Sequence, residues 1–181
     1  MVEVVNVIGS GSLRREFDLS VVAEDLGSVA DFDPDKYPAM YIRFSDDAPL
    51  VTVYRTGKFI ITGADSIEGL YELKDNLLDC LSSRGIIFED DLEWFEVQNL
   101  VCTTVLADDL NLSALAVGLG LEQTEYEPEQ FPGLIYRNPD FECVVLIFST
   151  GKAVITGSSN LDNVEVVEGH LKQKLSSLQL K

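Results

Sequence analysis

The chain reads TGKFIITG at residues 56–63 and TGKAVITG at residues 150–157, which is a displacement of 94 positions. Other matched pairs keep a spacing of 93 or 94: Asn6 with Asn99, Leu19 with Leu112, Pro34 with Pro128, Tyr37 with Phe131, Arg43 with Arg137, and Tyr54 with Phe148. Two copies of so long a unit are too few for a solenoid, so the sequence predicts a pseudo-twofold molecule with one continuous surface built from equivalent halves. Duplex DNA is a ligand of matching symmetry.

The composition is that of an acidic globular protein. Its 181 residues are 46% hydrophobic and carry 31 Asp and Glu against 13 Lys and Arg, for a formal net charge of −18. The acids are scattered in short groups, which is typical of a solvated surface rather than of a disordered acidic arm. We interpret the charge as an adaptation to high salt, as in a halophile, in preference to a functional acidic patch.

Targeting and cysteine signals point to an intracellular protein. The first residues lack the basic segment of a signal peptide, and no apolar run reaches membrane-spanning length. Cys80, Cys102 and Cys143 are odd in number and form no CxxC pair, so neither a disulfide framework nor a zinc site is expected. We therefore predict a cytoplasmic protein without membrane, metal or cofactor.

Both halves show the same order of predicted elements: strand, short helix, three antiparallel strands, long helix. A capping Asp or Asn precedes each short helix, and the Thr-Gly-Lys tripeptides are placed as hairpin turns. Apolar residues recur at helical spacing in the long helices, which would lay one stripe of each against a sheet. The ranges are 3–8, 19–26, 39–44, 49–55, 58–63 and 66–84 in the first half, and 96–105, 112–119, 133–137, 143–149, 152–157 and 160–178 in the second.

If the helices cover one sheet face, alternation along the strands assigns the side chains of the other face. The side chains there that match between the halves are one amide, one threonine hydroxyl and several aliphatic and aromatic groups per half. The set is Asn6, Ile8, Thr52, Tyr54, Ile60 and Thr62 in the first half, and Asn99, Val101, Leu146, Phe148, Val154 and Thr156 in the second.

This face has no nucleophile beside a base, no matched carboxylate pair and no histidine, so the sequence does not predict an enzyme. It does suit the minor groove of A·T-rich DNA, which offers mainly acceptors and is read through its width and through van der Waals contact. Asn and Thr can donate to those acceptors, and aliphatic side chains can lie on the groove floor. Matched cations flank the strands and are expected to contact phosphates: Arg43, Lys58, Arg137 and Lys152.

With these residues the chain resembles the TATA-box-binding protein family in its archaeal form. The clearest runs are QNLV at 98–101, YEPEQFPGLIYR at 126–137, VLIFSTGK at 145–152 and VITG at 154–157. The resemblance covers essentially the whole chain and implies an α+β fold with repeats at 1–88 and 89–181. In that fold ten antiparallel strands form a curved, saddle-like sheet, with four helices on its convex face.

The resemblance also implies roles for individual residues. Minor-groove contacts fall on Asn6, Ile8, Ile60, Thr62, Asn99, Val101, Leu146, Val154 and Thr156, and the two intercalating aromatic pairs fall on Tyr37 with Tyr54 and on Phe131 with Phe148. Glu127 and Glu129 fall on the surface that meets archaeal transcription factor B, which leads to RNA polymerase. A kinked duplex is likewise a property implied by the family.

Three departures from the family pattern affect the expected binding. The intercalating aromatic pair of the first half, here called the tyrosine wedge, is Tyr37 with Tyr54, where the family usually has two phenylalanines. Its two hydroxyls must stay hydrated or find acceptors between the bases, so we predict weaker or differently oriented DNA binding from that half. A lysine that often follows the Thr-Gly-Ala of the family is absent after Ala64, so we expect fewer contacts to DNA phosphates than is usual in the family. Arg14 and Arg15 follow an atypical Gly9-Ser10-Gly11 segment and remain unassigned.

A second class of function stays open. A divergent paralogue could keep the fold as a protein-interaction platform with little DNA affinity, which the tyrosines, missing lysines and acidity motivate. A substrate-gripping domain of a nuclease or glycosylase is a distant third reading. A homodimer of the DNA-free protein, hiding its concave face, is also left open.

Overall fold

The computed structural model describes residues 1–178 and divides into two compact units. The first-repeat unit is Asn6–Gln98, and the second-repeat unit combines Met1–Val5 with Asn99–Lys181. The division of the sequence into repeats at 1–88 and 89–181 stays a prediction, and its last three residues lie outside the described range.

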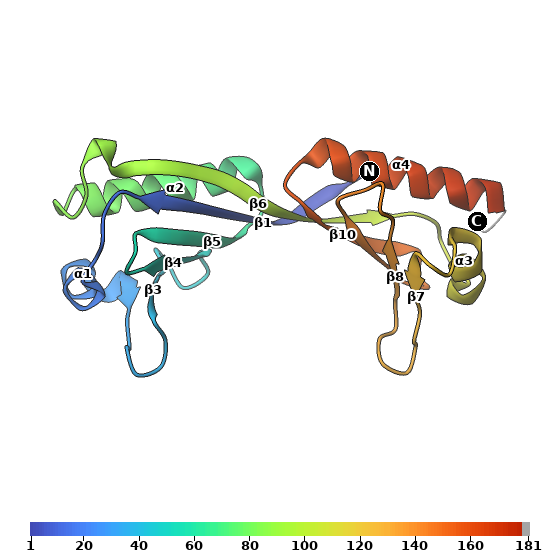
Figure 1. The fold of residues 1–181 in the computed structure, drawn as a ribbon, viewed down its shortest axis with the longest axis horizontal. Helices are drawn as coiled ribbons and strands as arrows, with labels where there is room; N and C mark the ends of the chain where they lie inside the picture. The colour runs from blue at the N-terminus through green and yellow to red at the C-terminus, as the bar shows by residue number, and fades with distance from the viewer. Residues whose placement is uncertain (179–181) are drawn as a thin grey trace. The chain divides into compact units, whose positions relative to one another are not determined.

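The elements of the first repeat follow the predicted order (Figure 1). They are β1 (Glu3–Leu13), α1 (Leu19–Leu26), the short 3-10 helix η1 (Gly27–Val29), β2 (Ala30–Asp31), β3 (Ala39–Ile42), β4 (Leu50–Tyr54), β5 (Lys58–Ala64) and α2 (Ile67–Ser82). The second repeat begins after η2 (Glu89–Asp91) with β6 (Leu92–Val105), followed by α3 (Leu112–Leu119), β7 (Thr124–Glu125), β8 (Leu134–Arg137), β9 (Val144–Ile147), β10 (Lys152–Ser158) and α4 (Leu161–Leu178).

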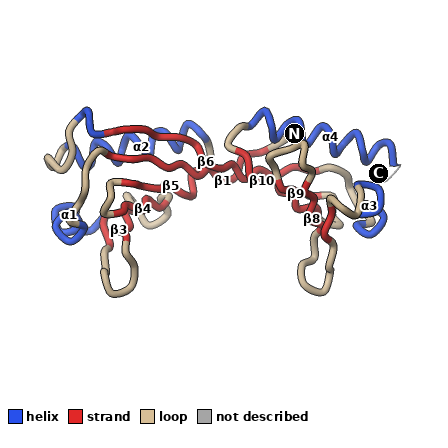
Figure 2. The backbone as a smooth tube through the Cα atoms, viewed as in Figure 1, coloured by secondary structure: helices blue, strands red, loops and turns tan. Residues whose placement is uncertain are grey.

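The strands belong to one ten-stranded sheet in the order β2-β3-β4-β5-β1-β6-β10-β9-β8-β7. The β5 strand pairs antiparallel with both β1 and β4, and β10 pairs antiparallel with both β6 and β9, so the two repeats use the same connectivity. Figure 2 shows the strands of each repeat in red and its helices in blue. Ten strands and, among residues 1–178, four α-helices confirm the predicted α+β class.

The ends of several elements differ from the sequence expectation. The two-residue strands β2 and β7 are too short to give an alternation signal, and only the family resemblance implied them. Strand β1 was expected to end at residue 8, but it continues to Leu13 through the glycine-rich segment. A Cβ on Gly9 would meet Phe95 and Leu70, and one on Gly11 would meet Phe59, so glycine lets bulky core side chains approach β1 closely.

The helix starts and hairpin turns follow from local chemistry. Asp18 Oδ1 accepts hydrogen bonds from the backbone N–H groups of Ser20 and Val21, and Asn111 Oδ1 accepts one from Ala114. Both predicted N-caps are therefore confirmed. The turn glycine of the second octapeptide, Gly151, has φ 77° and lies where a Cβ would meet the Ala107 carbonyl, so a larger residue cannot replace it without strain.

The apolar stripe of each long helix packs on the sheet. Leu70, Leu77 and Leu81 of α2 are buried, as are Val164, Val167, Leu171 and Leu175 of α4. The sheet contributes the side chains between them, including Phe59 and Ile61 from β5 and their repeat equivalents Ala153 and Ile155 from β10. Burying these side chains supplies the main driving force for folding each unit.

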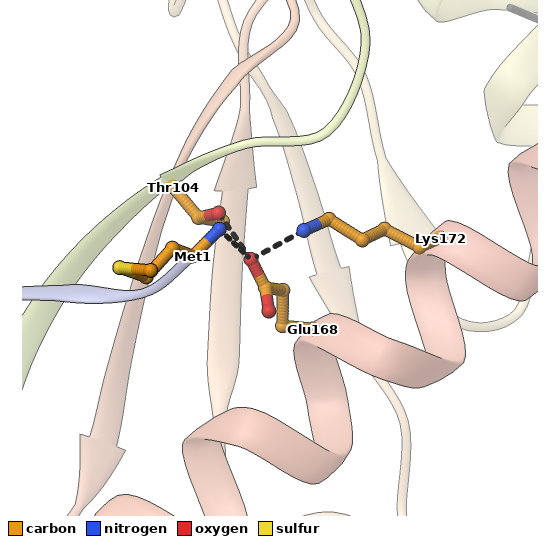
Figure 3. Close-up of polar contacts among 4 residues, drawn as sticks. All are labelled: Met1, Thr104, Glu168 and Lys172. Atoms are coloured by element: carbon orange, nitrogen blue, oxygen red, sulfur yellow. Dashed lines mark hydrogen bonds and ion pairs between the residues drawn. The ribbon is translucent and has the colours of Figure 1, made fainter.

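A polar cluster joins α4 to β6 in the second-repeat unit (Figure 3). Glu168 Oε1 accepts from Lys172 Nζ at 2.8 Å and from the Thr104 hydroxyl, and it lies 3.2 Å from the Met1 amino nitrogen. Desolvation of this carboxyl raises its pKa, but the hydrogen bonds from Lys172 and Thr104 outweigh that effect and lower the pKa from 4.5 to about 2. The carboxylate is thus stabilised in its charged form.

Candidate nucleic-acid interface

Each unit has a sheet face opposite its long helix, here called the open face. In β5, Phe59 and Ile61 are buried under α2, whereas Ile60 and Thr62 are half-buried and alternate with them. Strand register extends the face across the unit, because Ile60 pairs with Ser10 on one side and Thr52 on the other. The face consists of Asn6, Ile8, Ser10, Tyr41, Thr52, Tyr54, Ile60 and Thr62 in the first-repeat unit, and of Ile135, Val144, Leu146, Asn99, Val101, Thr103, Val154 and Thr156 in the second.

The amides of the open face are fixed by the backbone. Asn6 Oδ1 accepts from the Gly63 N–H at 2.9 Å, and Asn99 Oδ1 accepts from the Gly157 N–H at 2.8 Å. Asn99 also lies within hydrogen-bond distance of Thr156, with Asn99 Nδ2 donating to Thr156 Oγ1 at 3.1 Å. Both amide oxygens are therefore engaged. The Asn6 amide nitrogen remains for an acceptor on a ligand, and Asn99 Nδ2 has one hydrogen left beside its bond to Thr156.

The second-repeat unit holds its aromatic pair together. Phe131 and Phe148 pack edge to face, with ring centroids 5.9 Å apart and an interplanar angle of 63°. Both rings are only partly buried, and Gly133 leaves room for them because a Cβ there would meet both. Neither ring is among the buried core side chains, so both remain available to contact a ligand.

The first-repeat unit has tyrosines in the corresponding place, and the structure adds one that the sequence reasoning missed. Tyr37 is 41% exposed and stacks on Tyr41, with centroids 5.2 Å apart and an interplanar angle of 22°. Burial raises the pKa of Tyr54, and the nearby Tyr37 hydroxyl adds to that shift. The 94-residue spacing matches Tyr41 with Ile135, a signal that could have found it.

The four expected phosphate contacts are all exposed, but their surroundings differ. Lys58 and Lys152 begin β5 and β10, and no ion pair engages either within residues 1–178. Arg43 Nη1 donates to the Ala48 carbonyl at 2.8 Å, and Arg137 Nε lies 3.5 Å from Glu125 Oε1. Each arginine uses one of its five guanidinium donors in these contacts, so the others remain for a phosphate.

The loop between β7 and β8 carries the two glutamates that the resemblance assigned to a protein partner. Glu127 and Glu129 are exposed, and the Glu127 carbonyl accepts from the Gln130 and Phe131 N–H groups at 2.9 and 3.0 Å. The loop projects from the sheet in Figure 1, as does its counterpart between β2 and β3. A hydrogen-bonded turn therefore links the glutamates to Phe131.

Arg15, unassigned by sequence, makes contacts within the protein. Its Nη1 donates to the Ile86 carbonyl at 2.9 Å, its Nε lies 3.2 Å from Asp91 Oδ2, and its guanidinium carbon lies 4.9 Å from the centroid of the Phe88 ring. These contacts hold the end of β1 against the segment before β6. Arg15 therefore has a structural role in the first-repeat unit.

Two kinds of feature are absent from the part of the chain that the structure describes. No group of three or more His, Cys, Asp or Glu residues there could hold a metal ion. No helix within residues 1–178 is long and apolar enough to cross a bilayer.

Comparison with known proteins gives one consistent result. The model of the family "Transcription factor TFIID (or TATA-binding protein, TBP)" matches residues 1–83 and 94–178. TATA-box-binding protein C of Halobacterium salinarum is 44% identical, with 98% of each chain covered, and TATA-box-binding protein 2 of Haloferax volcanii is 40% identical over 99% of this chain and 95% of its own. The solved Methanococcus jannaschii TBP superposes with a TM-score of 0.85 at 35% identity, covering 97% of this chain and 98% of its own.

Proposed function

The chain belongs to the TATA-box-binding protein family, and on that premise we propose that it binds A·T-rich promoter DNA in the minor groove and bends it. In this proposal the complex then recruits archaeal transcription factor B and, through it, RNA polymerase. The protein would act as a general initiation factor in the cytoplasm, on the nucleoid.

The observation that carries the proposal is the matched pair of fixed amides on the open face. The minor groove of an A·T pair offers acceptors, adenine N3 and thymine O2. Asn6 and Asn99 each have their oxygen bound to a glycine N–H, so each presents donors to such acceptors. The aliphatic side chains beside them, Ile8, Ile60, Val101, Leu146 and Val154, supply the van der Waals contact that a groove floor requires.

Bending follows from the aromatic pairs. An apolar ring that enters a base step partly unstacks it and kinks the duplex toward the major groove. Phe131 with Phe148, and Tyr37 with Tyr54, are partly exposed aromatic rings in equivalent positions of the two repeats. Unstacking costs a few kcal/mol per step, which contacts to the bent duplex offset.

The charge of the protein sets the conditions for binding. A body of net charge −18 is repelled by phosphates at low ionic strength, whereas the screening length falls to about 3 Å near 1 M salt. Short-range contacts then decide affinity. We expect binding to be tightest in molar KCl, the reverse of the usual loss of affinity with salt.

The test is an anisotropy titration of labelled duplex with the full chain, from low salt to molar KCl. An A·T-rich TATA site and a scrambled site of the same composition serve as the matched pair. Preference for the TATA site, rising with salt, supports the proposal. Equal binding of both duplexes, or of neither at any salt, would instead favour the protein-interaction platform.

A further inference from the structure

A hollow on the open face of the first-repeat unit lies beside the tyrosine wedge. Its volume is about 480 Å³, and Tyr54, Ile60, Ser10 and Trp94 line it together with Arg55 and Lys58. Trp94, on β6, is the only tryptophan of the chain and is 37% exposed. Its neighbour Phe95 points the other way, stacking on Phe59 with centroids 5.7 Å apart.

The charge of this hollow differs from that of the protein as a whole. The chain has 31 acids against 13 bases, yet the residues that line the hollow include two cations and no carboxylate. Lys58 has no ion-pair partner in the described part of the chain. Arg55 pairs with Glu16 at 3.0 Å, but both side chains are exposed, so this pair is weak and a phosphate can compete for the guanidinium.

The combination of an exposed indole with unopposed cations fits a nucleotide. Aromatic rings stack on bases or pack on sugars, while Lys and Arg neutralise the phosphate. The hollow also continues directly from Tyr54, so DNA whose base step receives the wedge would pass its next nucleotide over Trp94. The second-repeat unit has no such ring, because its equivalent of Trp94, 93 residues earlier, is Met1.

We propose that the Trp94 hollow binds one nucleotide of the duplex just outside the element gripped by the open face. Its sugar or base packs on the Trp94 ring, and its phosphate lies between Lys58 and Arg55. This inference rests on the proposed function and deepens it, since it extends the footprint on the side of the first repeat alone. The contact makes the two ends of the site unequal.

The experiment uses the single tryptophan as its reporter. The full chain in molar KCl is titrated with two duplexes, one carrying the A·T-rich element with flanking pairs on both sides and one cut at the edges of the element. Anisotropy of a label on the DNA measures binding, and Trp94 emission measures contact. We expect both duplexes to bind, and only the flanked duplex to quench or shift the emission.

Variants sharpen the test. Trp94→Ala should weaken binding of the flanked duplex by about fivefold or more, as loss of one aromatic stacking contact does, and leave the cut duplex unchanged. Trp94→Phe should restore most of the affinity. Phe88→Leu is the control, because Phe88 is an aromatic of the same unit that is 65% exposed and lies outside the hollow, and leucine keeps an apolar side chain beneath Arg15.

The outcomes separate the two proposals. Unchanged Trp94 emission on tight binding of the flanked duplex, with equal affinities for wild type and Trp94→Ala, overturns the inference and leaves the proposed function standing. If neither duplex binds by anisotropy, the proposed function fails and the inference fails with it. Equal quenching by a free deoxynucleotide would make the hollow a mononucleotide site, which also overturns the inference.

Discussion

The side-chain oxygen of Asn99 accepts a hydrogen bond from the backbone N–H of Gly157 at 2.8 Å. The same bond joins Asn6 to Gly63 at 2.9 Å in the other repeat. Both glycines have positive φ, 98° and 97°, and both lie where the strand register shifts by one residue. An irregularity of the strand thus supplies the N–H that orients each amide toward the open face.

Asn99→Asp tests this orientation. The aspartate keeps an acceptor for the Gly157 N–H but replaces the amide donors with a negative oxygen. We expect DNA affinity to fall by about tenfold or more with little change in melting temperature. Asn76→Asp adds the same charge on the exposed side of α2 and is the control; an equal loss there would show that charge alone, and not the donor, matters.

Phe148→Ala should abolish bending while leaving the fold intact. The ring packs on Phe131 but is partly exposed, so its loss should cost well under the 3–5 kcal/mol typical of a buried phenylalanine. Energy transfer between dyes at the duplex ends measures the bend, and thermal unfolding measures stability. Phe59→Ala, in the core, is the comparison; if Phe148→Ala destabilises the protein as much, its ring belongs to the core instead.

Replacing both wedge tyrosines, by Tyr37→Phe and Tyr54→Phe, should tighten binding. Each hydroxyl loses water between partly unstacked bases at a cost of about 1 kcal/mol, so the double variant should gain about tenfold or more in affinity. Burial raises the pKa of Tyr54, so its hydroxyl is neutral and the gain should not vary between pH 6 and about pH 8. Tyr71→Phe on α2 should have no effect, and unchanged binding by the double variant would refute the desolvation argument.

Glu129→Lys should remove archaeal transcription factor B from the complex without weakening DNA binding. The residue is exposed on the turn between β7 and β8, and charge reversal opposes whatever basic surface meets it. Loss of the slower-migrating ternary band in a gel-shift assay measures this effect. Asp35→Lys makes the same reversal at the matching position of the first repeat, 94 residues earlier, and should keep the ternary band.

Glu168→Gln should change the response of stability to acid. The folded-state pKa of about 2 lies below the ordinary 4.5, so the carboxylate stabilises the protein above pH 4.5, and that contribution is lost as pH falls toward 2. The upper bound is on the order of 3 kcal/mol. Urea unfolding in molar KCl should show a flatter pH dependence for Glu168→Gln than for wild type. Glu165→Gln, exposed on the same helix, should retain the wild-type slope.

Most of the fold could be predicted from sequence because local signals agree with the tertiary structure. The helices at 19–26 and 112–119 lie where capping and periodicity placed them, and Thr-Gly-Lys forms both hairpin turns. Strands β2 and β7 gave no signal, because two residues cannot show an alternation. The sequence did not predict that β1 continues to Leu13, because glycine usually indicates the end of a strand. Here Gly9 and Gly11 lie within the strand because the side chains of Phe95 and Phe59 leave no room for a Cβ.

The sequence repeat by itself determined that the molecule has two equivalent halves with strands at corresponding positions. It also determined which side chains of those strands alternate onto one face, because both features depend on residue spacing alone. Only the tertiary structure decided what each side chain on that face can do. In the folded chain the Asn99 oxygen accepts a hydrogen bond from Gly157, and Tyr37 stacks on Tyr41. Arg15 forms an ion pair with Asp91, and Trp94 lines the same hollow as Tyr54. All but the Tyr37–Tyr41 stack join residues far apart in the chain, so they arise from strand pairing and packing, which no local pattern encodes.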